Sequence, residues 1–245
     1  MATESTGLVG ADILLNMRGV RTGYGSSPIL QGIDLAVRHG EIVAVIGRNG
    51  VGKTTMMRSL IGQLPVWEGS ISFKGRDITR LLPERRAQAG IGYIPQGREV
   101  FARMTVAENL AIGEMIGGRG GRKLHELVYG YFPVLAERCD QAAGTMSGGQ
   151  QQLLAIGRAL IGNPDLLLLD EPSEGIQPSM VEEISKIMLQ INRELGTTIL
   201  FVEQNLDVIM AMTQRCYVMD KGRIIAELPS HALADRDVVK RHLQI

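Results

Sequence analysis

Three short segments carry residues whose types and spacing suit phosphate chemistry. The first runs from Gly47 to Thr54 and reads GRNGVGKT, the second is the pair Asp170-Glu171 after an apolar run, and the third is the turn Ser147-Gly148-Gly149-Gln150. A nucleotide site of the usual kind needs only the first two. The third segment therefore predicts a second phosphate-contacting surface, which acts on another molecule.

The segment from Gly47 to Thr54 has the spacing of a phosphate-binding loop, between an apolar strand pattern and a helical pattern. Its glycines let backbone N–H groups turn inward, and the helix N-terminus adds positive potential. We expect Lys53 to reach the β- and γ-phosphates of ATP and Thr54 to offer its hydroxyl to Mg²⁺. A plain glycine-rich turn is the alternative. The residues expected to contact nucleotide are Gly47, Arg48, Asn49, Gly50, Val51, Gly52, Lys53, Thr54 and Thr55.

The carboxylate pair follows the apolar run 166–169, which predicts a buried strand. Such a strand delivers Asp170 and Glu171 to the carboxyl edge of a sheet, where ligands bind in open α/β folds. Asp170 is expected to hold Mg²⁺, and Glu171 to orient and polarise the attacking water. The alternative for Glu171 is an acidic residue that complements a helix dipole.

Composition limits the class of protein. The chain has 245 residues, a length that suits one domain or two small lobes, and its hydrophobic content of 44% is enough to form a buried core. Lys+Arg and Asp+Glu are equal at 26 each, which argues against broad nucleic-acid binding. Cys139 and Cys216 match no metal-binding spacing and are expected to be reduced thiols of a cytosolic protein. No apolar run approaches the ~20 residues that cross a bilayer, so we expect any membrane role to come through partners.

Strand and helix patterns alternate along most of the chain, which predicts a mainly parallel sheet. Residues 98–163 are instead helix-rich and are predicted to form a lobe inserted into a core of residues 1–97 and 164–245, in a single domain. Thr105 and Glu108 have the spacing of a capping box. Expected strands cover 13–20, 33–37, 41–46, 71–73, 91–94, 166–169, 197–202, 215–219 and 223–228. Expected helices cover 53–64, 83–88, 106–115, 125–137, 147–161, 179–195, 206–213 and 231–243, with a flexible break at 117–122.

Together these segments resemble the ATP-binding subunits of ABC transporters, from about Leu14 to the C-terminus. The resemblance implies a P-loop NTPase fold with a mainly parallel sheet, a small antiparallel β portion and an inserted helical subdomain. In that family Ser-Gly-Gly-Gln is the signature motif, which contacts the γ-phosphate of ATP held by the opposite subunit. Two chains would then pack head to tail around two ATP molecules, with Ser147, Gly148 and Gly149 of one facing Lys53 of the other. Read alone, Ser147 to Gln150 is only a capped helix start.

Two further positions match the family. Tyr24 lies where the family keeps an aromatic residue that stacks on adenine, and its alternative role is a core aromatic at a strand end. Gln96 matches a glutamine whose amide touches Mg²⁺ or the water and whose loop signals to the membrane subunit. Its alternative is an ordinary surface residue.

Two positions depart from the family pattern. Gln204 stands where most members place a histidine that bonds the γ-phosphate. Its amide can donate a hydrogen bond but cannot carry charge, so the resemblance gives it only part of the histidine's catalytic role. Gln177 stands where the family usually has an aspartate, which puts cross-subunit coupling through that residue in doubt.

Both departures recur in one branch of the family. The segments 95–101 (PQGREVF), 174–179 (EGIQPS) and 202–205 (VEQN) resemble those of importers for branched-chain amino acids, urea and short-chain amides. That resemblance implies an identical or related second ATPase, two membrane permeases and a periplasmic solute-binding protein. The subunit would be cytoplasmic, on the inner face of the cell membrane. The solute does not touch this subunit, so the sequence does not select it.

Three other functions remain open at this stage. One is the ATPase of an exporter, which the branch resemblance disfavours. Another is a soluble ATPase acting on DNA or ribosomes, which usually has two cassettes or a coiled-coil insertion, neither of which the sequence contains. The third is a regulator that binds ATP without turnover, suggested by Gln204 and opposed by the presence of Lys53, Asp170 and Glu171.

Overall fold

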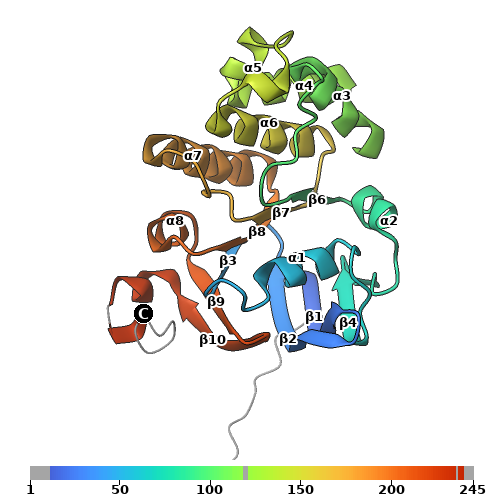
Figure 1. Ribbon diagram of the computed structural model, residues 1–245, viewed down its shortest axis with the longest axis vertical. Coiled ribbons are helices and arrows are strands. Elements are labelled where there is room, and N and C mark those ends of the chain that lie inside the picture. Colours follow the sequence, from blue (N-terminus) through green and yellow to red (C-terminus); the bar gives the residue numbers. More distant parts are fainter. Residues whose placement is uncertain (1–11, 118–120, 236, 240–245) are drawn as a thin grey trace, which may run out of the picture.

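Two sheets form the frame of the molecule (Figure 1). A computed structural model describes residues 12–117, 121–235 and 237–239. The smaller sheet is antiparallel, in the order β2-β1-β4-β5, and the larger has the order β10-β9-β3-β8-β7-β6, with only β10 and β9 paired antiparallel. The smaller sheet contains β1 (Ile13–Tyr24), β2 (Ser27–Arg38), β4 (Glu68–Phe73) and β5 (Arg76–Asp77). The larger contains β3 (Ile42–Ile46), β6 (Ile91–Ile94), β7 (Leu166–Asp170), β8 (Thr198–Glu203), β9 (Arg215–Asp220) and β10 (Arg223–Pro229).

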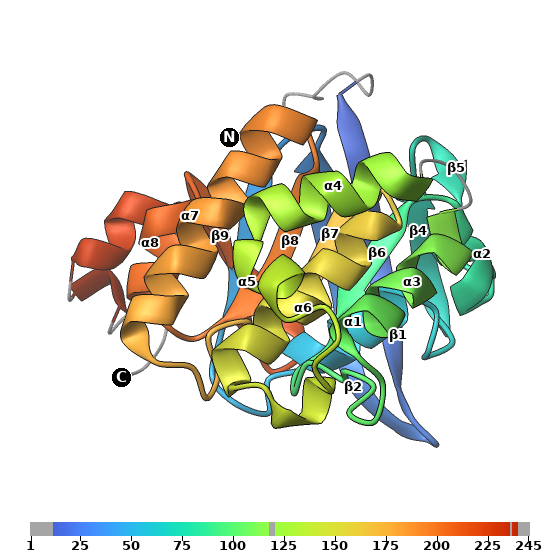
Figure 2. The same ribbon diagram turned by 90° about the horizontal axis from the view of Figure 1, so that it is seen from above.

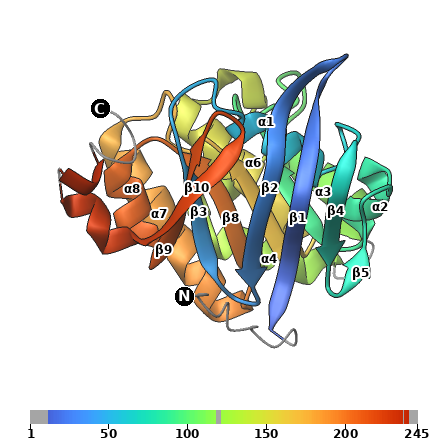
Figure 3. The ribbon, with the colours of Figure 1, turned by 90° about the horizontal axis from the view of Figure 1, so that it is seen from below.

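Helices cover the larger sheet on both faces. Helix α1 (Lys53–Leu60) shares a hydrophobic core with residues of both sheets, and the smaller sheet lies on that side (Figure 3). The opposite face packs against a helical layer that Figure 2 shows from above. This layer contains α3 (Val106–Gly117), α4 (Gly121–Tyr131), α5 (Pro133–Glu137), α6 (Gly148–Ile161), α7 (Pro178–Leu195) and α8 (Leu206–Met212). The remaining helices are α2 (Pro83–Gln88) and the 3₁₀ turns η1 (Ala143–Thr145) and η2 (Ser230–Ala234).

The central strands are apolar without interruption because both of their faces are buried. In β7, Leu166 and Leu168 join the core around α1, whereas Leu167 and Leu169 join the core beneath the helical layer. A strand held in this way delivers Asp170 to a fixed point at the carboxyl edge of the sheet, as the sequence predicts. No helix in the described ranges is long and apolar enough to span a membrane.

The main elements lie where the sequence predicts them, and the capping box of α3 is confirmed. The amide of Glu108 donates to Thr105 Oγ1 at 3.1 Å, and the amide of Thr105 donates to Glu108 Oε2 at 2.7 Å. Strands β1 and β2 extend beyond the predicted 13–20 and 33–37 because they pair with each other as far as Tyr24 and Ser27. The pairing partner supplies hydrogen bonds that a local pattern does not reveal.

Two predicted helices are wrong in extent. The helix predicted over 125–137 is divided, because Pro133 cannot donate a backbone hydrogen bond and keeps Phe132 out of the helical region, at φ −129° and ψ 72°. Helix α1 ends at Leu60 rather than residue 64, and Gly62 follows at φ 82°.

The chain after β10 differs from the predicted helix over 231–243. It forms the 3₁₀ turn η2 and, after residue 236, a helical stretch over 237–239, while residues 240–243 lie outside the described part. In the predicted break at 117–122, residue 117 ends α3 and residues 121–122 begin α4. Residues 118–120 of that break are outside the described part.

Candidate functional site

The loop from Gly47 to Thr54 (the phosphate loop) joins β3 to α1 in a conformation that its glycines permit. A Cβ atom at Gly47 would lie 2.4 Å from the carbonyl oxygen of Met219, and Gly52 has φ 111°. Gly52 is also the N-cap of α1, and no side chain caps the helix there. Among the described residues no side chain caps the N-terminal amides of α1, which suits a bound anion.

Lys53 is buried at the mouth of the phosphate loop, with 4% of its side chain exposed. Its ammonium donates to the carbonyl oxygens of Gly47 at 2.8 Å and Arg48 at 3.2 Å. It also forms an ion pair with Glu171 Oε1 at 3.1 Å. A lysine held at this place presents its charge where a phosphate would enter the loop.

Asp170 brings a carboxylate to the first turn of α1. The Thr54 hydroxyl donates to its Oδ1 at 3.2 Å, and the Tyr93 hydroxyl donates to its Oδ2 at 3.3 Å. Burial raises the pKa of the Asp170 carboxyl, with a further contribution from Glu171, while the bond from Thr54 acts in the opposite direction. One hydroxyl and one carboxylate are the oxygen ligands that Mg²⁺ takes when phosphates and water complete its shell. The donor set therefore fits Mg²⁺ bound together with a nucleotide, and the described residues hold no group of three or more His, Cys, Asp or Glu that could bind a metal alone.

Glu171 and Gln204 meet beside the lysine. Gln204 Nε2 donates to Glu171 Oε1 at 3.0 Å, so the same oxygen receives Lys53 and the amide of Gln204. The backbone of Glu171 has φ 49°, which few residues with a side chain adopt. This arrangement places a carboxylate, a cation and an amide donor within one cluster.

Tyr24 and Gln96 lie outside that cluster. Tyr24 ends β1 with 44% of its surface exposed, and its hydroxyl accepts a hydrogen bond from Arg58 Nη1 at 3.2 Å. Gln96 follows β6, and its amide donates to Glu174 Oε2 at 2.9 Å. The tyrosine ring is accessible to a ligand, and the amide of Gln96 bonds the carboxylate of Glu174 in a loop rather than that of Asp170.

The turn of residues 147–150 (the Ser147 turn) begins α6 with a complete capping box. The Gln150 amide donates to Ser147 Oγ at 3.3 Å, and the Ser147 amide donates to Gln150 Oε1 at 3.1 Å. The guanidinium of Arg98 is packed against Gly148: a Cβ atom added to Gly148 would lie 3.2 Å from Arg98 Nη1. Within the described residues no hydrogen bond or ion pair joins this turn to the phosphate loop. Within the described part of one chain, the two predicted phosphate-contacting segments therefore share no polar contact.

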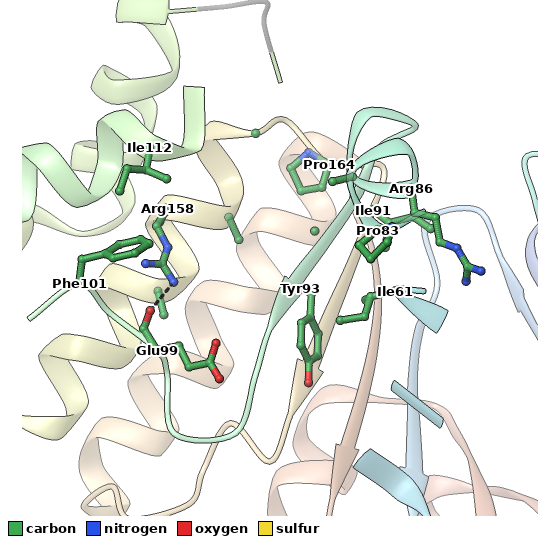
Figure 4. Close-up of a pocket in the computed structure, with 15 residues that line it drawn as sticks. Ile61, Pro83, Arg86, Ile91, Tyr93, Glu99, Phe101, Ile112, Arg158 and Pro164 are labelled. Carbon is green, nitrogen blue, oxygen red and sulfur yellow. Dashed lines mark hydrogen bonds between the residues drawn. The ribbon is translucent and has the colours of Figure 1, made fainter. Parts of the chain in front are cut away.

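A cavity of about 330 Å³ opens between the helical layer and the core (the groove), shown in Figure 4. Arg158 lies along it with its guanidinium 5.1 Å from the centre of the Phe101 ring. Its Nη2 donates to the carbonyl oxygen of Glu99 at 2.9 Å, whereas its buried Nη1 has no hydrogen-bond partner among the residues that the structure describes. The groove thus combines an apolar lining with one unmet cationic donor, near the loop that carries Gln96.

Comparison with known proteins decides the family. A family model described as ABC transporter matches residues 30–174, more than half of the chain. The chain belongs to the ABC transporter family. It is 41% identical over 228 residues to the high-affinity branched-chain amino acid transport ATP-binding protein BraG of Pseudomonas aeruginosa, covering 93% of this chain and 97% of that protein. It is 35% identical to the probable branched-chain amino acid transport ATP-binding protein LivF of Archaeoglobus fulgidus, covering 84% and 87%.

Solved structures agree with this assignment. A nucleotide-free ATP-binding cassette from an ABC transporter superposes with a TM-score of 0.82 at 31% identity, covering 93% of this chain and 98% of that one. An ABC transporter cassette in its ADP conformation gives the same TM-score and identity. The predicted fold and the predicted family of ABC transporter ATP-binding subunits are confirmed, and ATP hydrolysis coupled to transport is general for this family.

Several contacts of this ABC transporter subunit involve residues that the sequence analysis missed. Tyr93 bonds Asp170, Arg58 bonds Tyr24, and Arg98 donates to the Glu174 carbonyl oxygen at 2.9 Å. Glu203, next to Gln204, is also buried, with only 3% of its surface exposed. A charged residue directly after the apolar run 199–202 is the one signal in the sequence that could have drawn attention to Glu203.

Proposed function

We propose that this protein is the ATP-hydrolysing subunit of an importer for branched-chain amino acids. The observation that carries the proposal is the cluster in which Lys53, Glu171 and Gln204 meet beside the Thr54–Asp170 pair. It brings a phosphate-binding cation, a carboxylate suited to orient water and the ligands of Mg²⁺ to one edge of the sheet. The similarity to BraG and LivF supports the choice of solute.

Each residue has a defined part in the proposed reaction. Lys53 and the amides of the phosphate loop bind the β- and γ-phosphates, which displaces the Lys53–Glu171 ion pair. Thr54 and Asp170 would hold Mg²⁺, which would supply positive charge beside the phosphates, and the amide oxygen of Gln96 would be a further ligand. Glu171 then accepts a hydrogen bond from the attacking water, and Gln204 donates to the γ-phosphate in place of histidine.

The Ser147 turn acts on ATP held by a second copy or a related ATPase. Within the described residues of one chain the turn has no polar contact with the phosphate loop, which supports this arrangement, because its hydroxyl hydrogen and glycine amides are then available to an outside anion. Two chains packed head to tail thus form two composite sites. Tyr24 stacks on adenine, which its exposed ring permits.

The permeases provide the second set of contacts. We place their docking site at the groove, whose unmet Arg158 donor suits a carboxylate on an otherwise apolar permease segment. The groove includes Glu99 and Phe101, which follow Gln96 in the chain, so a permease seated there would sense changes at the nucleotide. Docking of this kind holds the subunit on the inner face of the cell membrane, and a periplasmic binding protein delivers the solute from the other side.

Uptake in cells that carry the gene tests the proposal. Deletion of the gene should abolish high-affinity uptake of labelled leucine. The wild-type gene should restore this uptake, and a gene that carries Glu171→Gln should not. Labelled urea and acetamide form separate arms of the experiment. Loss of urea or amide uptake with normal leucine uptake would overturn the solute, and normal uptake of all three would overturn the importer role.

A further inference from the structure

Glu203 is a buried carboxylate that the proposed reaction does not use. It is the last residue of β8, and only 3% of its surface is exposed. A charged group loses hydration in such a place, so its oxygens must be satisfied by donors from the protein. The four donors that satisfy them come from two different loops.

Each oxygen of Glu203 serves one loop. Oε1 accepts from the consecutive backbone amides of Gln204 at 2.7 Å and Asn205 at 3.1 Å. Oε2 accepts from Ser173, from its hydroxyl at 2.6 Å and its backbone amide at 3.3 Å. The carboxylate therefore joins the turn after β8 to the loop after β7.

This connection begins where the sheet ladder stops. The last backbone bond between the two strands runs from the Glu171 amide to the Val202 carbonyl oxygen at 3.0 Å. Beyond it, Glu203 joins the two segments one residue past Val202 and two residues past Glu171. Glu171 and Gln204 each give a backbone amide to one of these two connections, and their side chains meet at 3.0 Å.

The backbone of Glu171 makes such an anchor necessary. Its φ of 49° lies in the left-handed region, which persists in a residue with a side chain only when its surroundings impose it. The Val202 carbonyl fixes the amide of Glu171, and Glu203 fixes Ser173 on the other side of Pro172.

We propose that Glu203 is a positioning residue, whose carboxylate sets the relative placement of Glu171 and Gln204 for hydrolysis. It does not touch the nucleotide and acts through the two loops that it joins. This inference rests on the proposed role of Glu171 in hydrolysis. A displacement of about 1 Å in a reacting group can lower a rate by about 100-fold, so small shifts of these loops have large consequences.

Glu203→Gln tests the proposal with little change in volume. The amide keeps one oxygen and replaces the other with NH₂, so it fails to accept from one of the two loops whichever way it turns. With full-length protein and MgATP, we expect kcat to fall about 10- to 100-fold while the Kd for MgATP stays within about twofold of wild type.

Glu41→Gln is the matched control, because Glu41 is also largely buried and lies away from the site. Its carboxylate accepts from Arg215 Nη2 at 2.7 Å and from the Arg38 amide at 2.9 Å. This variant should lower the melting temperature and leave kcat within about twofold of wild type. An equal fall of kcat in both variants would overturn the positioning role, as would an unchanged kcat in Glu203→Gln.

Ser173→Ala keeps the test decisive if Glu203→Gln does not fold. It removes only the hydroxyl bond to Oε2, so kcat should fall about fivefold with the Kd for MgATP unchanged. A wild-type kcat in Ser173→Ala would then overturn the inference. Wild-type protein that releases no phosphate would instead contradict the proposed function.

Discussion

The phosphate loop and the Ser147 turn are two glycine-containing turns that each begin a helix, yet the N-termini of the two helices are capped differently. Helix α1 has no side-chain cap. Two residues of its loop contact carboxylates of the same chain: Lys53 pairs with Glu171, and Thr54 bonds Asp170. Helix α6 has a complete capping box, and Ser147 itself is exposed. The N-terminus of α1 is thus left without a side-chain cap, which suits an anion bound within the same chain. The Ser147 turn is stable without an anion and presents its surface outward.

The largest effect is expected at Glu171, inside the enclosed site. Glu171→Gln should lower phosphate release about 1000-fold, because an amide cannot take up a proton from water. Lys53 and the phosphate loop, which bind the phosphates, are unchanged in this variant, so MgATP should still bind and should trap a dimer. Light scattering after size exclusion measures the dimer, and Glu183→Gln on the exposed face of α7 is the control. Undiminished hydrolysis in Glu171→Gln would remove its catalytic role.

Ser147→Arg tests the outward-facing turn. A long cationic side chain at this exposed position should weaken MgATP-dependent dimerisation about 100-fold, because it obstructs close approach of the partner's nucleotide. ATP binding by the monomer should be unchanged. Ser147→Ala, which removes the cap without adding bulk, should weaken dimerisation less. If Ser147→Arg dimerises as well as wild type, the two turns do not share a nucleotide.

Tyr24 tests how far the enclosed site extends. Tyr24→Ala should weaken binding of a fluorescent ATP analogue about tenfold, because the stacking surface for adenine is lost. Tyr24→Phe keeps the ring and loses only the bond with Arg58, so its affinity should stay within about twofold of wild type. Equal affinities for Tyr24→Ala and wild type would place adenine elsewhere.

The smallest effect concerns stability. Because the folded-state pKa of Asp170 is raised, mainly by burial, its stabilising contribution is present below the unfolded pKa and is lost as pH rises through the folded value. Asp170→Asn should therefore raise the melting temperature at pH 7 by about 1–3 °C in the absence of nucleotide, with a smaller difference in acid. Calorimetry at both pH values measures it.

Asp77→Asn is the control of opposite sign, because hydrogen bonds from Thr79 lower the pKa of Asp77. Its contribution is present above the unfolded pKa and is lost as pH falls through the folded value. The variant should not raise the melting temperature at pH 7. A lower melting temperature in Asp170→Asn would show that the buried carboxylate is not costly.

The sequence predicts best those features that depend on neighbouring residues. The phosphate loop, the strand ending at Asp170, the capping box at Thr105 and the helix start capped by Ser147 are encoded by spacings of a few residues, and the structure forms each of them. The helix over 125–137 was predicted wrongly although the cause, Pro133, is local. The helical pattern of residues 125–137 predicts one helix, and it does not show that a single proline divides it.

Contacts between distant segments could not be predicted in this way. Thr54 and Asp170 are 116 residues apart, and Tyr93 is 77 residues from the same carboxylate. The sequence places each of them at the end of a strand or the start of a helix, but the strand order decides which ends become neighbours.

By itself, the sequence determined which chemistry is available: a phosphate loop, a carboxylate pair and a second glycine turn. The tertiary structure decided that Lys53 pairs with Glu171, that Glu203 joins two loops, and that the Ser147 turn stays apart from the phosphate loop. The physical reason is that hydrogen bonds and ion pairs act only over a few ångströms. Only the packing of the sheet and its helices brings distant parts of the chain within that range.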